Sequence, residues 1–207
     1  MIELYAAPTT NGLRTKIMLD ECGLPYTLRV IDIAARENKE PWFLELNPDG
    51  LVPVLVDSDG PGGETVTMSQ SLGILMYLAE KSGRFVPSDP VERTRFWPAL
   101  MNAATDIAPA VVSIFLIQRR AEGPDNSAAE KVFEDRFRDF MSVWDRRFAT
   151  QKWCAGDDVT IADFAMYPVF MRCRDVIPQI TVDLPNVDRW AAGMAARKGV
   201  SKGMRFD

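Results

Sequence analysis

The sequence contains no histidine and only three cysteines. The absence of histidine excludes Ser-His-Asp and Cys-His catalysis, histidine metal ligands and any imidazole acid or base. Cys22, Cys154 and Cys173 lie too far apart for a zinc knuckle or a CxxC redox pair. An odd, small number of cysteines is typical of buried thiols in a reducing compartment. We therefore expect a cytoplasmic protein without a metal site.

Positive charge is scarce in the first part of the chain. Residues 1–80 contain 5 Lys/Arg against 12 Asp/Glu, whereas residues 81–207 contain 19 against 17. An acidic chain without a basic stripe is a poor binder of nucleic acid. The first five residues show neither the basic region nor the apolar run of a signal peptide. The chain has no run of about 18 uncharged apolar residues, so the sequence predicts no membrane span.

The composition that remains is that of an ordinary globular protein. Hydrophobic residues make up 47% and charged residues 26% of the 207 positions. These values exclude disordered, collagen-like and disulfide-scaffold proteins. The length suits one large domain or two small ones.

The periodicity of apolar residues divides the chain in two. Strand patterns at 2–6, 26–33, 52–57 and 65–68 alternate with helical patterns that begin near 13 and 70. After Gly83 the strand patterns almost vanish and helical stripes follow, with Pro109 expected to kink one of them. The predicted fold class is α/β plus all-α. The predicted parts are an α/β domain 1–82, a linker 83–90 and an all-helical domain 91–207.

Three local features have both a structural and a functional interpretation. Pro53 lies one residue into a strand, and base rates favour a trans bond at the edge of the sheet over a cis bond. Ser71 precedes a helical stripe and is first of all an N-cap, with an anion site at the helix start as the alternative. Thr160 and Asp163 form a capping box, which explains the carboxylate without a catalytic role.

The loop after the first strand is the remaining candidate. Thr9, Thr10 and Asn11 lie between the first strand and the first helix, with Tyr5 at the end of that strand. Ligands of α/β folds gather at the carboxyl ends of strands, where helix N-termini point at them. Capping is the structural alternative for these side chains, and packing is the alternative for the tyrosine.

Four segments, taken together and in this order, resemble the cytosolic glutathione S-transferase superfamily. They are Leu4–Gly12, Asn47–Leu55, Ser69–Ala79 and Gly156–Asp163, and the resemblance covers essentially the whole chain. It implies a thioredoxin-like N-terminal domain that binds glutathione as a substrate. It also implies a helical domain with a pocket for the second substrate, a homodimer, and a cis bond before Pro53.

The resemblance also implies roles for individual residues in binding glutathione. The backbone of Val52, before Pro53, is expected to pair with the cysteinyl part. Gln70 and Ser71 are expected to hold the γ-glutamyl end, although the family often has Glu at the position of Gln70. The glycine carboxylate is expected near two further residues, Asn38 and Lys39.

The loop Ala7–Gly12 is most similar to that of the bacterial Nu-class branch, whose members include glutathione-dependent disulfide-bond oxidoreductases. That similarity implies that Thr9 and Asn11 face the sulfur and stabilise the thiolate. The thiolate would then attack a disulfide or a small electrophile. Two alternatives stay open: a transferase activated by Tyr5, and a non-catalytic regulator or binding protein with the same fold.

Overall fold

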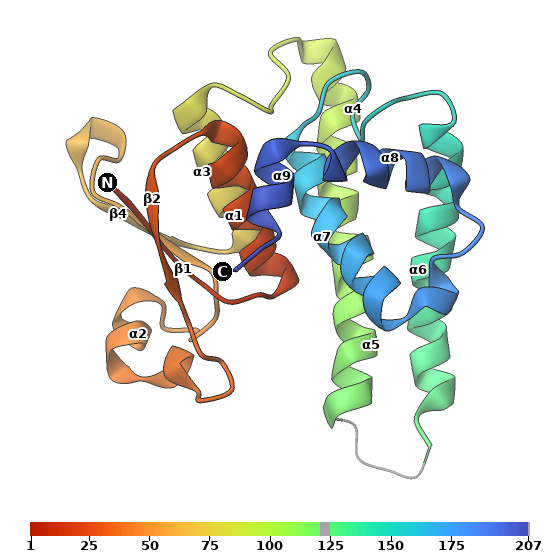
Figure 1. Cartoon of the computed structure of the whole chain (residues 1–207), viewed down its shortest axis with the longest axis horizontal. Coiled ribbons are helices and arrows are strands. Elements are labelled where there is room, and N and C mark those ends of the chain that lie inside the picture. Colours follow the sequence, from red (N-terminus) through yellow and green to blue (C-terminus); the bar gives the residue numbers. More distant parts are fainter. Residues whose placement is uncertain (121–124, 207) are drawn as a thin grey trace. The chain divides into compact units, whose positions relative to one another are not determined.

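The computed structural model describes residues 1–120 and 125–206 (Figure 1). They form two compact units, one of residues 1–84 with 195–207 and one of residues 85–194. The sequence predicts instead that the entire stretch 91–207 belongs to the helical domain. The difference arises at the C-terminal end, which returns to the first unit.

A four-stranded mixed sheet forms the centre of the first unit. Its strands are β1 (Ile2–Ala6), β2 (Tyr26–Val30), β3 (Val54–Asp57) and β4 (Val66–Ser69). They are arranged in the order β2-β1-β3-β4, with β1 and β2 parallel and the other two pairs antiparallel. The carboxyl ends of β1 and β2 therefore lie at the same edge of the sheet, where Thr9 follows β1.

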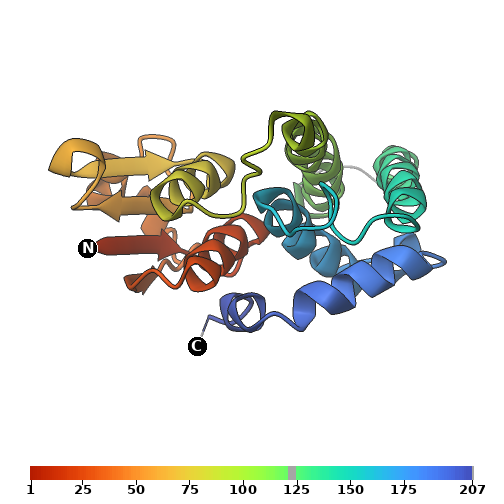
Figure 2. The ribbon, with the colours of Figure 1, turned by 90° about the horizontal axis from the view of Figure 1, so that it is seen from above.

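Helices cover both faces of this sheet. The helices α1 (Thr10–Cys22) and α3 (Ser71–Ser82) pack side by side on one face (Figure 2). The short helix α2 (Pro41–Leu46) contributes Phe43 to a separate small core with Ile31 and Val54, against which Tyr5 packs. Two 3-10 turns, Glu37–Lys39 and Pro61–Gly63, complete the connections.

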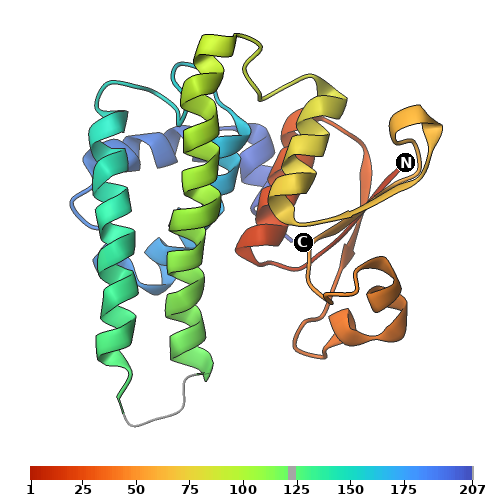
Figure 3. The same ribbon diagram turned by 180° about the vertical axis from the view of Figure 1, so that it is seen from behind.

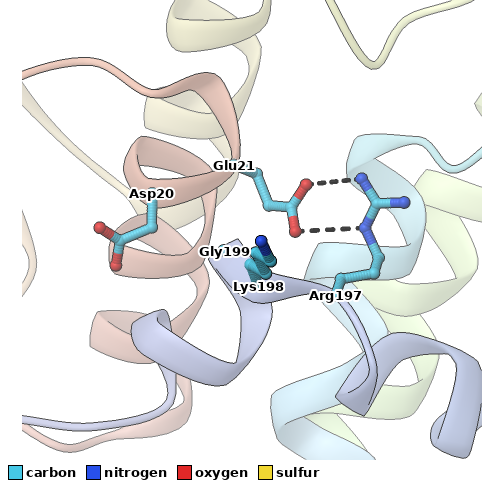
Figure 4. Close-up of a pocket in the computed structure, with 5 residues that line it drawn as sticks. All are labelled: Asp20, Glu21, Arg197, Lys198 and Gly199. Atoms are coloured by element: carbon cyan, nitrogen blue, oxygen red, sulfur yellow. Dashed lines mark hydrogen bonds and ion pairs between the residues drawn. The ribbon is translucent and has the colours of Figure 1, made fainter.

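The helix α9 (Lys198–Gly203) packs against α1 through two glycines. A Cβ atom on Gly203 would lie 2.5 Å from the Cα of Ile17, and one on Gly199 would lie 2.8 Å from the Cα of Glu21. Glu21 also accepts two hydrogen bonds from the Arg197 guanidinium (Figure 4) and one from the Val200 N–H. This close approach of backbones explains why the C-terminal segment belongs to the first unit.

The second unit consists of helices, several of which lie side by side in Figure 3. They are α4 (Pro90–Met101), a π-helical segment (Asn102–Ile107), α5 (Ala108–Arg120), α6 (Ser127–Phe148), α7 (Ile161–Val176) and α8 (Pro185–Ala195), with a 3-10 turn at Pro178–Ile180. The predicted kink site, Pro109, is the second residue of α5, two positions after the π-helical segment.

The core of the second unit is rich in aromatic rings. Phe148 stacks on Trp190 with ring centroids 5.2 Å apart, and Phe170 and Tyr167 meet the same indole edge-on. The Trp144 Nε1–H donates to the Asn102 side chain at 2.7 Å. Rings of this size bury much apolar area, and the two indole nitrogens have the partners that buried indoles need.

Asp163 supports this core from the start of α7. Its carboxylate is fully buried and accepts hydrogen bonds from the N–H groups of Cys154 and Thr160 and from Trp190 Nε1, each at 2.9 Å. Burial raises the pKa of Asp163, and these hydrogen bonds offset part of that rise. The capping box is confirmed, and the same carboxylate also holds the neighbouring loop and α8.

Candidate functional site

The start of α1 places Thr9 at the carboxyl end of β1. The Thr9 backbone is extended, and its Oγ1 accepts a hydrogen bond from the Gly12 N–H at 3.1 Å. A Cβ atom at Gly12 would lie 2.1 Å from the Ala7 carbonyl oxygen, so this tight turn requires glycine. Because Oγ1 accepts from Gly12, the hydroxyl proton of Thr9 is directed elsewhere and can be donated to a ligand.

Asn11 is tied to α3 through its side-chain oxygen. Oδ1 accepts a hydrogen bond from Arg14 Nη1 at 2.7 Å and one from the Ser71 hydroxyl at 3.3 Å. A guanidinium can only donate, so the amide atom that faces Arg14 must be the oxygen. The Nδ2 end of the exposed Asn11 amide is therefore the end that can donate to a ligand.

Arg14 is the charged residue at the centre of this cluster. Only 3% of its surface is exposed, and Nη1 also lies 3.4 Å from Ser71 Oγ. Burial lowers the pKa of Arg14 to about 10, so the side chain remains a cation at neutral pH. Arg14 is not among the site residues predicted from the sequence. Its spacing three positions after Asn11 on a helix is the signal from which the contact could have been predicted.

The Val52–Pro53 peptide bond is cis, as the family resemblance implies. The ladder of β3 begins at Val54, which leaves the backbone of Val52 outside the sheet. Gln70, at the end of the neighbouring strand, has φ +68° and ψ 108°, a conformation that non-glycine residues rarely adopt. Strained backbone of this kind is concentrated at ligand-binding positions.

Asn38 and Lys39 are held by the loop that precedes Val52. The Asn38 Nδ2 donates to the Gly50 carbonyl at 2.7 Å, and the Lys39 Nζ donates to the Asp49 carbonyl at 2.9 Å. Asn38 is buried, whereas Lys39 is exposed. The structure thus joins Asn11 and Ser71 by a hydrogen bond, places Thr9 at the N-cap of the helix that carries Asn11, and gives Asn38 a clear role in holding its loop.

Tyr5 occupies the opposite face of the sheet from α1. Its hydroxyl donates to the Glu3 carboxylate at 3.0 Å, and its ring packs near Trp42. Burial raises the pKa of Tyr5, and the contact with Glu3 raises it further. These contacts favour a neutral, packed tyrosine.

Two cavities of the first unit differ in chemistry. One, of about 440 Å³, lies beside the β1–α1 loop and is lined by Thr9, Pro8 and the residues 30–34 after β2. The other, of about 400 Å³, lies between α1 and the start of α9 and is lined by charged residues such as Glu21 and Arg197 (Figure 4). Only the first contains one of the predicted site residues.

Comparisons with known proteins assign the family. The glutathione S-transferase N-terminal domain matches residues 10–81, and the glutathione S-transferase C-terminal domain matches residues 100–198. This chain belongs to the glutathione S-transferase family. The predicted family and fold class are confirmed.

Several members of the glutathione S-transferase family are similar over most of the chain. The disulfide-bond oxidoreductase YfcG of Escherichia coli is 31% identical over 81% of this chain and 78% of its own. The maleylacetoacetate isomerase of Rhizobium meliloti is 33% identical, with 91% and 89% covered. A glutathione transferase family member from Pseudomonas fluorescens, solved with two glutathione bound, is 28% identical, with 98% and 92% covered and a TM-score of 0.92.

These relatives agree with the predicted activity of this glutathione S-transferase family member. Relatives among them are named as glutathione S-transferases and as a disulfide-bond oxidoreductase, which supports a glutathione-dependent transferase or disulfide reductase. Among residues 1–120 and 125–206, no group of three or more acidic, cysteine or histidine side chains forms a metal site.

Proposed function

We propose that this protein stabilises the thiolate of bound glutathione with Thr9 and Asn11 and uses it to reduce a disulfide. The observation that carries the proposal is the pair of donors at the start of α1. The Thr9 hydroxyl is oriented by its contact with Gly12, and the Asn11 amide is oriented by its contact with Arg14. In this proposal both groups donate to one sulfur atom at the N-terminus of α1.

The electrostatics of this helix support the proposal. The first turn of α1 contains no acidic residue, so nothing there competes with an incoming anion for the positive end of the helix dipole. A free thiol has a pKa of about 8.5. Two or three hydrogen bonds to the charged form lower that pKa by about 1–2 units.

The chemistry needs no cysteine of the protein. Burial raises the pKa of Cys22, Cys154 and Cys173, which makes all three poor nucleophiles. The glutathione thiolate would attack one sulfur of the substrate disulfide, form a mixed disulfide and release the other sulfur as a thiolate that takes a proton from water. A second glutathione would then resolve the mixed disulfide, so that two glutathione molecules are oxidised as the substrate is reduced.

The remaining predicted residues bind the rest of glutathione in this proposal. Ser71 and Gln70 would hold the γ-glutamyl end, and the backbone of Val52, fixed by Pro53, would pair with the cysteinyl part. The glycine carboxylate would meet Lys39, whose loop is held by Asn38. The first unit would thus bind glutathione, and the helical unit would supply the pocket for the second substrate.

Two alternatives are weaker. Activation by Tyr5 requires a hydroxyl that faces the sulfur, but Tyr5 donates to Glu3 and has a raised pKa. A non-catalytic binding protein is favoured by the neutral Gln70, which holds an ammonium group with less charge than the Glu frequent in the family. The donors at Thr9 and Asn11 support catalysis over that alternative.

The test is the ultraviolet absorbance of the bound thiolate as a function of pH. We expect the wild-type protein to lower the glutathione pKa by about 1–2 units, and the double variant Thr9→Ala, Asn11→Ala to lose that effect. Tyr5→Phe is the matched control and is expected to titrate like the wild type. An unchanged pKa in the double variant would reject the site.

Turnover distinguishes the classes of second substrate. The protein should be assayed with a model disulfide, an aryl halide and a cis-trans isomerisation substrate, since one relative is an isomerase. We expect disulfide reduction to be fastest. Faster conjugation or isomerisation would contradict disulfide reduction as the main reaction. No activity in any of the three assays, together with no binding of glutathione, would favour the non-catalytic binding protein.

We further propose a cytoplasmic homodimer that contacts its second copy through α4 and α5. One stretch, Pro90–Arg119, is long and apolar enough to cross a membrane, although Asp106 interrupts its apolar run. Trp97 and Met101 on α4 are 40% and 44% exposed, and Val112 and Leu116 on α5 are 47% and 44% exposed. Each pair is spaced by four residues and shares one helix face, as expected of a protein contact.

Light scattering of the purified protein tests the homodimer. Trp97→Glu and Leu116→Glu are expected to give monomers. Val132→Glu on α6, where the valine is equally apolar and 63% exposed, is the control and should remain dimeric. A wild-type monomer, or dimers in all variants, would contradict the assignment.

A further inference from the structure

The buried guanidinium of Arg14 lies between the two parts of the site that hold opposite ends of glutathione. Its Nη1 contacts Asn11 Oδ1 at 2.7 Å and Ser71 Oγ at 3.4 Å. Asn11 belongs to the proposed sulfur end, and Ser71 belongs to the proposed γ-glutamyl end. Arg14 lies in the second turn of α1, and only 3% of its surface is exposed.

The chemistry of the guanidinium sets the polarity of both partners. It carries only donors, so it forces an oxygen toward itself on the Asn11 amide and on the Ser71 hydroxyl. A neutral amide in the same place has a donor and an acceptor and would allow Asn11 to adopt either orientation. With Arg14 present, Nδ2 of Asn11 remains the donor at the outer end of the amide.

Ser71 has a single proton to donate, and this limits what it can do for Asn11. That proton now points at Asn11 Oδ1 over 3.3 Å. When Ser71 donates it to the γ-glutamyl carboxylate of glutathione, Asn11 Oδ1 loses this donor. The contact from Arg14, which is the shorter one, then holds the amide through the reaction.

We propose that Arg14 is a positioning residue that acts through Asn11: it fixes the amide with Nδ2 toward the glutathione sulfur and links that amide to Ser71. The inference rests on the proposed function, because it assumes that Asn11 Nδ2 donates to the thiolate. It adds a residue that touches no reacting atom. The loss of Arg14 should therefore change the thiol pKa only while Asn11 is present.

A double-mutant cycle on the bound thiol pKa tests this dependence. Arg14→Met is expected to raise the pKa of bound glutathione by about one unit, which leaves about three- to eightfold less thiolate at neutral pH for a bound pKa of about 6.5–7.5. In the Asn11→Ala background, the same substitution should add nothing. Arg14→Lys keeps the charge but cannot donate to both oxygens in the planar geometry of arginine, and we expect it to recover only part of the shift.

The control is Arg29→Met, which removes a cation of the same unit that stacks on Trp42 at 3.9 Å from its ring centroid. It should leave the thiol pKa unchanged. Thermal melts of each variant establish that it is folded, and Arg14→Lys supplies the measurement if Arg14→Met does not fold. The turnover number for a model disulfide should fall with the thiolate fraction, whereas a merely structural arginine would lower the melting temperature alone.

Three results would overturn the inference. A folded Arg14→Met or Arg14→Lys protein with the wild-type thiol pKa would give Arg14 no part in activation. If Arg14→Met raises the thiol pKa in the Asn11→Ala background as well, the charge of Arg14 acts on the sulfur directly. A wild-type protein whose bound thiol titrates like free glutathione would reject the proposed function itself, and that result appears before any variant is made.

Discussion

The helices of the two units begin in different ways. In the helical unit, carboxylates stabilise the starts of α4, α7 and α8. Asp89 and Asp145 accept from the first N–H groups of α4 and α8, and Asp163 accepts from the N–H of Thr160, the N-cap of α7. In the first unit, α1 and α3 have no acidic residue in the first turn. Carboxylate caps make a helix start self-sufficient, whereas α1 and α3 retain a positive end that suits an anion.

The capping patterns of α7 and α1 differ at one position. Thr160 and Thr9 are both N-cap threonines with an extended backbone. Asp163 lies three residues after the first, and the glycine Gly12 lies three residues after the second. One substitution in the capping pattern therefore separates a structural helix start from a candidate site.

The largest effect is expected from removing the carboxylate cap of α7. Asp163→Ala would leave the N–H groups of Cys154 and Thr160 and the Trp190 indole N–H without their buried acceptor. We expect a loss of about 3–5 kcal/mol in the free energy of unfolding, measured by denaturant titration. The exposed Asp157 is the matched control, and Asp157→Ala should change stability by less than about 0.5 kcal/mol. Equal stability of the two variants would refute the role of Asp163.

The next effect comes from closing the turn at the start of α1. A Cβ at Gly12 would meet the Ala7 carbonyl oxygen at 2.1 Å and displace the loop that carries Thr9. We expect Gly12→Ala to cost about 1–3 kcal/mol of stability and most of the disulfide reductase activity. Gly73→Ala is the control, because its Cβ meets nothing closer than 4.0 Å within a helix. It should be neutral or stabilising by up to about 1 kcal/mol, and a matching loss in both variants would contradict the steric argument.

Asn11→Asp converts the start of α1 into the type found in the helical unit. The new carboxylate would favour the helix dipole and pair with Arg14, so stability should rise by about 0.3–1 kcal/mol. The same charge would repel the glutathione thiolate and raise its pKa. We expect activity at neutral pH to fall by about three- to eightfold for a pKa rise of one unit. Denaturant titration and thiolate absorbance measure the two effects, and a variant that keeps full activity would contradict the proposed role of the amide.

Much of the fold could be predicted from the sequence because the patterns are local. The first strand, 2–6, is found at the predicted residues, and the capping box at Thr160 follows from its spacing alone. The return of α9 to α1 could not be predicted, since it depends on the fit of Gly199 and Gly203 against a backbone far away in the sequence.

The candidate site was only partly visible in the sequence for the same reason. Thr9 and Asn11 lie at the start of α1, which local rules identify, and Ser71 lies at the start of α3. The contact between Asn11 and Ser71 joins residues 60 positions apart, and Arg14 completes it from inside the protein. A buried arginine in an apolar stripe looks like a surface residue until the fold is known.

The smallest effect is expected from Asp57, a buried carboxylate of the first unit at the end of β3. Burial raises the pKa of Asp57, but hydrogen bonds from Lys81, Tyr77 and the Asp59 N–H outweigh it and hold the pKa below its ordinary value. A depressed pKa means that the folded state favours the ionised form. The stabilisation is therefore complete above the unfolded pKa of about 4 and is lost as the pH falls through the folded value.

Asp57→Asn should remove this part of the acid sensitivity. We expect the wild type to lose more stability than the variant between neutral pH and pH values below about 4, with a difference smaller than the effect of Gly12→Ala. Denaturant titrations of both proteins across this range provide the measurement. Because Asp57 joins the end of a strand to α3 and caps no helix start, the thiol pKa of bound glutathione should be the same in both proteins. A change in that pKa would show that the carboxylates of the first unit are not separated from its anion site.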